Sequence, residues 1–72
     1  MLHESNRKEV NRMTNLERIR RNAGLSQDAL AEKSGVSRPV IVRIENGGID
    51  RATGRTIRKL AEALECSISE LF

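Results

Sequence analysis

The sequence predicts a small, compact all-α domain. Its 72 residues suffice for one domain with one core, apolar residues recur at helical spacing, and no stretch alternates as a β-strand does. Phe72 is the single aromatic residue, which argues against a β-sandwich. Charged residues make up 32% of the chain and hydrophobic residues 38%, a balance compatible with a helical domain. We expect five short helices packed on one core.

Each expected helix begins at a serine or threonine, whose side chain can cap the first turn. Thr14 and Ser67 are each followed three residues later by a glutamate, which is a capping-box pattern. Glycines or an Asn-Gly pair close the first three helices. With their caps, the expected helices cover residues 14–24, 26–35, 37–47, 53–65 and 67–72. The glycine-rich segment GGIDRA forms a loop between the third and the fourth.

The second and third expected helices meet at a tight corner. Ala31 is small enough for two helix backbones to approach closely where they cross. Four residues later, Gly35 can adopt the left-handed conformation that turns the chain. Ser37 then restarts the helix, and Pro39 fits its first turn, where a missing amide costs little. The N-terminal residues of the third helix are therefore expected to be exposed.

Charge is unevenly distributed along the chain. Thirteen Lys and Arg against ten Asp and Glu give a net charge of +3, and most of the basic residues are arginines. Residues 51–59 hold four basic residues, whereas residues 62–70 hold three glutamates and no base. We expect a basic face and an acidic end. Since guanidinium groups suit phosphate and guanine, the arginine bias points towards nucleic acid.

Other features exclude several classes of protein. Cys66 is alone and His3 is the single histidine, so neither a disulfide framework nor a metal site is expected. No glycine-rich phosphate loop or catalytic constellation is evident, and we expect no enzyme, cofactor or small-molecule effector. The chain has no apolar run of membrane-spanning length, and we expect a cytoplasmic protein. Residues 1–13 are expected to be a flexible tail or an extension, and residues 14–72 the domain.

The corner resembles the helix-turn-helix of the phage repressor and Cro family, the xenobiotic-response-element type of DNA-binding domain with a lambda-repressor-like fold. The resemblance covers residues 14–72, with the helix-turn-helix formed by the second and third helices. It is carried, in order, by Ile19-Arg20, Gly24-Leu25-Ser26-Gln27, Leu30-Ala31, Gly35-Val36-Ser37, Ile41, Ile44-Glu45-Asn46-Gly47, Leu60-Ala61-Glu62-Ala63-Leu64 and Ser67-Ile68-Ser69-Glu70-Leu71.

This resemblance implies that the third helix lies in the major groove of double-stranded DNA. It places four residues at base-facing positions: Arg38, Pro39, Val42 and Arg43. It places four others near phosphates: Gln27, Ser37, Asn46 and Arg51. The alternative for Arg38 and Arg43 is that they are solvated arginines on the helix surface. For Asn46 and Arg51, a phosphate contact and a solvated side chain are about equally expected.

The resemblance also implies a structural ion pair and reveals two departures. Arg20 and Glu45 match a pair that links the first helix to the end of the third. Ser34 stands where the family often has an apolar residue, so either packing is looser or its hydroxyl bonds back to a carbonyl. Glu65 stands where a glycine often ends the fourth helix, which implies strain or a different terminus.

The expected function is that of a sequence-specific transcriptional regulator, a repressor that binds a roughly palindromic operator as a homodimer. Its two recognition helices would lie about 34 Å apart, one turn of B-DNA. The candidates for dimer contacts, which could equally close the core, are Ile49, Ile68, Leu71 and Phe72. Two alternatives stay open: a protein-interaction module such as an antitoxin or regulatory subunit, and the DNA-binding half of a longer regulator.

Overall fold

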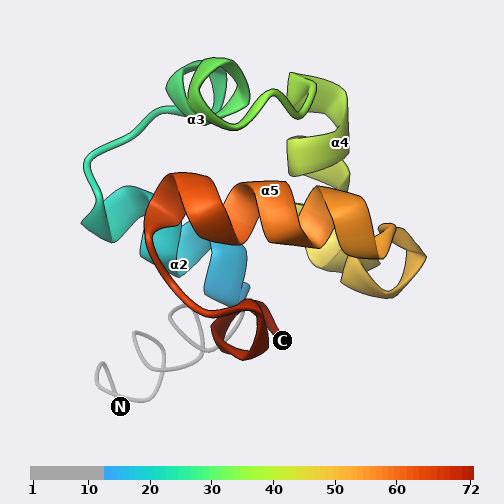
Figure 1. The fold of residues 1–72 in the computed structure, drawn as a ribbon. Coiled ribbons are helices and arrows are strands. Elements are labelled where there is room, and N and C mark those ends of the chain that lie inside the picture. The colour runs from blue at the N-terminus through green and yellow to red at the C-terminus, as the bar shows by residue number, and fades with distance from the viewer. Residues whose placement is uncertain (1–12) are drawn as a thin grey trace, which may run out of the picture.

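The computed structural model describes residues 13–72, and within this range its regular elements are all helical, without strands (Figure 1). The sequence-based expectation for residues 1–12 lies outside the described residues. In chain order the elements are α2 (Asn15–Asn22), α3 (Gln27–Ser34), α4 (Arg38–Arg43), the π-helical turn η1 (Ile44–Gly48), the 3₁₀ turn η2 (Ile49–Arg51), α5 (Gly54–Leu64) and the 3₁₀ turn η3 (Ile68–Leu71).

The expected count of five α-helices is not confirmed, because residues 13–72 contain four. The fifth expected helix is the single 3₁₀ turn η3, in which Glu70 Oε2 accepts from the amide and the hydroxyl of Ser67 at 2.8 and 3.0 Å. The third expected helix is α-helical only to Arg43 and continues as the wider turn η1. Gly47, with φ 104°, breaks the helical backbone inside that turn.

Capping side chains start three of the α-helices as expected. The hydroxyl oxygens of Thr14, Ser26 and Thr53 accept from the amide three residues further on, at 3.3, 3.0 and 3.1 Å. The reciprocal half of the Thr14 box does not form, because the Glu17 carboxylate pairs instead with Arg21 at 2.7 Å, one turn along α2.

The last α-helix ends in strained backbone. Glu65, which follows α5, has φ 55° and ψ 44°, the left-handed conformation that side chains with a Cβ rarely adopt. The sequence left open strain or a different terminus at this position. The helix ends at this position, and Glu65 adopts the strained left-handed backbone.

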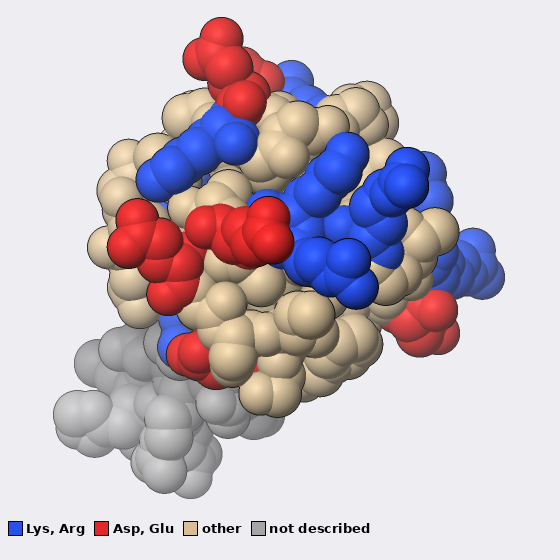
Figure 2. Space-filling view, in the orientation of Figure 1, with Lys and Arg blue, Asp and Glu red and all other residues tan. Residues whose placement is uncertain are grey.

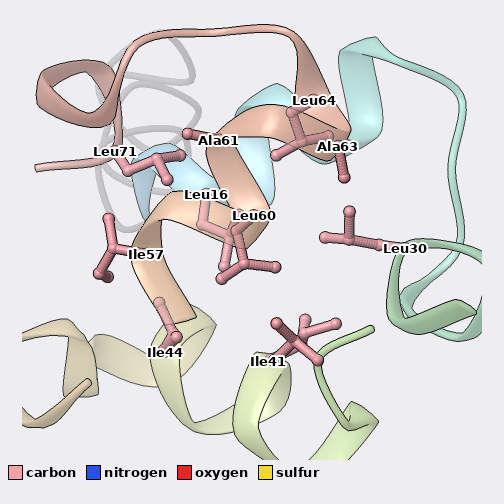
Figure 3. Packing of buried hydrophobic residues seen from close by; sticks show 11 residues of the cluster. Leu16, Leu30, Ile41, Ile44, Ile57, Leu60, Ala61, Ala63, Leu64 and Leu71 are labelled. Carbon is pink, nitrogen blue, oxygen red and sulfur yellow. The ribbon is translucent and has the colours of Figure 1, made fainter. Parts of the chain in front are cut away.

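The core lies between α5 and the other helices (Figure 3). Ile57, Leu60 and Leu64, which recur at helical spacing along α5, are buried. Leu30 from α3 and Ile41 from α4 are fully buried against it, and Figure 1 shows α3 and α4 on one side of α5. The complete buried cluster is Leu16, Leu30, Val36, Ile41, Ile44, Ile57, Leu60, Ala61, Ala63, Leu64 and Leu71. This anchoring fixes which face of α4 points outward.

Candidate nucleic-acid interface

The corner between α3 and α4 forms as the sequence predicts. Gly35 has φ 79°, and its amide donates to the Ala31 carbonyl at 2.9 Å, which ends α3. The Ser34 hydroxyl accepts from the Val36 amide at 3.1 Å. The alternative of a bond back to a preceding carbonyl was therefore wrong: the hydroxyl points forward and supports the turn. Buried Val36 closes the inside of the corner.

The outward face of α4 carries the residues expected to read bases. Ile41 is fully buried, and this anchors the opposite face of the helix in the core. Arg38, Pro39 and Arg43 are exposed, while Val42 is half-buried. Exposed side chains on one rigid helix can donate hydrogen bonds to an outside surface without disturbing the core.

Ser37 precedes this helix without capping it. It has the extended backbone of an N-cap residue, yet its side chain makes no capping hydrogen bond, unlike those of Thr14, Ser26 and Thr53. Ser37 is exposed. Its hydroxyl is therefore not needed to hold the first turn of α4 and can serve an external acceptor.

Three candidate DNA contacts lie together at the C-terminal end of α4 and in the turns that follow it. Arg43, Asn46 and Arg51 line one shallow depression of about 400 Å³. Asp50 lines the same depression and brings an acidic group that the sequence analysis did not consider. This arrangement joins residues of a helix and a loop that are separated in the sequence by a glycine pair.

Gly48 lines the same depression and lies close against Arg43, which the sequence analysis missed. A Cβ atom at Gly48 would lie 3.0 Å from both the Arg43 Cγ and the Arg43 carbonyl oxygen. A contact this close to backbone is tighter than most Cβ contacts in proteins, so a side chain at position 48 would require Arg43 to shift. The doublet Gly47-Gly48 was the available signal: one glycine has positive φ and the other allows close packing.

The Arg20–Glu45 pair is present and buried. Arg20 Nε lies 2.5 Å from Glu45 Oε2, and Arg20 Nη2 donates to Glu45 Oε1 at 3.1 Å. The remaining Nη1 donates to the Leu25 carbonyl at 2.8 Å. Hydrogen bonding to Glu45 raises the pKa of Arg20, against the opposite effect of burial. The pair thus joins α2 to the turn that follows α4.

Gln27 belongs to the same network, which the sequence analysis did not predict. Its Nε2 donates to Glu45 Oε1 at 3.0 Å from the first residue of α3. One amide hydrogen of Gln27 is therefore engaged inside the protein, and the rest of its half-buried amide remains for an external group.

Basic and acidic side chains separate along α5. Figure 2 shows Lys and Arg gathered over its N-terminal half and acidic residues over its C-terminal half. Arg55, Arg58 and Lys59 are exposed in the first half, and Glu62 and Glu65 are exposed towards its end. This agrees with the basic face and acidic end expected from the sequence.

An apolar patch lies near η3. Phe72 is 67% exposed and Ile68 is 42% exposed, and together with half-buried Ile49 they line an open groove of about 310 Å³. Leu71 is different: it is buried in the core. Of the residues considered for dimer contacts, Leu71 therefore closes the core, while the other three reach the surface.

The thiol of Cys66 is half-buried beside the core. Burial, with a smaller contribution from Glu70, raises the pKa of this thiol. A raised pKa reduces the fraction of reactive thiolate, which favours an inert thiol over a redox sensor.

The fold and the exposed face of α4 define a small helical domain built around a helix-turn-helix. The family comparison matches residues 16–71 with the family described as Helix-turn-helix, of the Cro/C1 type. The chain therefore belongs to this family, which consists of DNA-binding regulatory domains. The comparisons with curated proteins and with solved structures gave no match. None of the helices within residues 13–72 is long and apolar enough to cross a membrane.

Proposed function

We propose that the protein is a sequence-specific DNA-binding transcriptional regulator that inserts α4 into the major groove. The observation that carries the proposal is the orientation of α4. Ile41 fixes its inner face in the core, and Arg38 and Arg43 stand exposed on its outer face. A rigid helix with exposed guanidinium groups fits the width of the major groove.

The base-reading residues divide by chemistry. The guanidinium groups of Arg38 and Arg43 can each donate two hydrogen bonds to O6 and N7 of a guanine. Val42 can contact a thymine methyl group, and Pro39, which lacks a donor, can read only shape or methyl groups. We therefore expect the preferred site to contain guanines at two positions in each half.

A second group would bind phosphates and set the register of the protein on DNA. Gln27 stands at the start of α3, where the free amides also attract an anion. Ser37 has an unused hydroxyl, and Asn46 and Arg51 share the depression beside Arg43. Such contacts supply affinity that falls as salt rises and carry no sequence information directly.

We further propose that the protein acts as a repressor and binds a roughly palindromic operator as a homodimer. The exposed patch of Ile49, Ile68 and Phe72 supports a contact between two copies, because an apolar surface gains free energy when it is covered. Two copies with their α4 helices about 34 Å apart would occupy a promoter and block it sterically.

The experiment is selection of bound sequences from a random duplex pool at moderate salt. The selected duplex is then titrated against a scrambled duplex at two salt concentrations. The proposal expects an enriched two-fold symmetric site, preferred by roughly a thousandfold or more. Binding without an enriched sequence, and steeply reduced by salt, would mean that the protein attracts phosphate only.

The exposed Phe72 and Ile68 favour one second candidate function, that of a module that docks to a different protein, as an antitoxin or a regulatory subunit does. The double variant Arg38→Ala/Arg43→Ala separates the two functions. A DNA reader loses its specific site, whereas a docking module keeps its partner. If the protein is a docking module, Phe72→Glu should instead abolish binding to the partner protein.

A further inference from the structure

The first turn of α3 touches the first residue of α4 through an ion pair that the sequence analysis did not anticipate. Asp28 Oδ1 lies 3.4 Å from Arg38 Nε. Asp28 belongs to the first turn of α3, and Arg38 opens α4 on the other side of the Gly35 corner. The contact therefore spans the two helices of the helix-turn-helix at its outer surface.

Exposure indicates what this pair can do. The side chain of Arg38 is 58% exposed and that of Asp28 is 79% exposed. Exposed ion pairs add little to stability, since water and salt screen them. They can nevertheless restrict the rotamers of a long, flexible side chain, and an arginine that is already oriented loses less entropy when it binds.

The geometry of the contact suits an arginine that reads a base. It engages Nε, which lies on the stem side of the guanidinium group. The two Nη atoms at the far end remain for a second partner, and they are the pair that can donate to guanine O6 and N7. A carboxylate behind the guanidinium would hold the fork in that direction.

We propose that Asp28 is a positioning residue that determines specificity by orienting Arg38 towards one base pair. This inference rests on the proposed DNA-reading function. Asp28 also places a negative charge beside DNA, so it lowers the affinity for any sequence while it sharpens the choice among sequences. A residue that only stabilised the start of α3 would not both lower the affinity for every sequence and increase the discrimination among sequences.

The test measures the dissociation constant by fluorescence anisotropy for two duplexes: the selected site, and the same site with the base pair that depends on Arg38 exchanged. The ratio of the two constants reports discrimination. Asp28→Asn is expected to tighten binding to both duplexes and to reduce the ratio by roughly two- to fivefold, the range of an exposed ion pair. Asp28→Glu, which keeps the charge but moves the carboxylate, should also reduce the ratio.

Two controls make the result specific. Glu32→Gln removes the same charge from an exposed position on α3 and should leave the ratio unchanged. In an Arg38→Ala background, Asp28→Asn should no longer alter the ratio. An unchanged ratio in Asp28→Asn, or an equal change in Glu32→Gln, would overturn the inference while the base-reading role of Arg38 stands. If Arg38→Ala itself changes no base preference, the inference and that role both fail.

Discussion

Arg20 on α2 and Glu45 in η1 form a buried ion pair, with 2.5 Å between Arg20 Nε and Glu45 Oε2. The two side chains are 9% and 4% exposed. Gln27 adds a third contact at 3.0 Å to Glu45 Oε1. Because residues of α2, α3 and η1 meet at one carboxylate, this network fixes the corner against the rest of the domain.

Removal of one partner should destabilise the domain strongly. Arg20→Met leaves the Glu45 carboxylate buried without its cation, and we expect a loss of about 3 kcal/mol in the free energy of unfolding. Arg20→Met/Glu45→Leu, which removes both charges, should lose less than the single variant. Urea denaturation measures both. A single variant within about 0.5 kcal/mol of the parent would contradict the structural role.

The strained end of α5 offers a stabilising substitution. Glu65 has φ 55°, where glycine pays no steric penalty, so Glu65→Gly should raise stability by about 1 kcal/mol. In a domain of this size that corresponds to roughly 4 to 8 °C in Tm. Glu62→Gly is the matched control within α5 and should instead cost about 1 kcal/mol. A lower Tm for Glu65→Gly would show that Glu65 has contacts that outweigh its strain.

Gly48 and Gly54 should respond differently to the same substitution. Alanine at Gly48 would place its Cβ 3.0 Å from the Arg43 carbonyl oxygen, which should cost about 1 kcal/mol or more and displace Arg43. Alanine at Gly54, where nothing lies within 4 Å, should be neutral or stabilise slightly. Of these two variants, we expect only Gly48→Ala to bind the selected duplex more weakly than the parent. If a folded Gly48→Ala variant binds DNA as tightly as the parent, the position of Arg43 does not contribute to DNA binding.

The capping contact of η3 should make stability depend on pH in the acid range. Hydrogen bonds from the Ser67 amide and hydroxyl lower the pKa of Glu70 below the ordinary value of 4.5. The folded state therefore favours the carboxylate, and this contribution is present above the ordinary pKa and lost as the pH falls through the lower folded value. The Tm difference between the parent and Glu70→Gln should therefore shrink steadily as the pH falls below 4.5. A difference that stays constant from neutral to acid pH would contradict this.

Much of the fold follows from local sequence signals. The caps at Thr14, Ser26 and Thr53 and the corner at Gly35 were predicted because each depends on residues a few positions apart. The helical spacing of apolar residues likewise predicted the all-α fold. The π-helical turn after α4 was not predicted, because the sequence analysis took Asn46-Gly47 as a simple helix end and did not consider how closely Gly48 lies against Arg43.

The candidate site was predictable in its residue types but not in its internal contacts. The exposed arginines of α4 followed from helical periodicity together with the resemblance. The bond from Gln27 to Glu45 and the pair of Asp28 with Arg38 join positions 18 and 10 residues apart across a turn. Such contacts depend on the angle between two helices, which a sequence pattern does not specify.

The most direct test of base reading is to repeat the selection from a random duplex pool with Arg43→Ala and, as a control, with Arg55→Ala from the basic face of α5. Arg43→Ala should lose the preference at one base pair in each half of the selected site and keep the remaining preferences, at a cost of about 1 to 3 kcal/mol for that base. Arg55→Ala should keep the whole preference. If Arg43→Ala selects the same site as the parent, α4 does not read bases through Arg43, and the central claim is wrong.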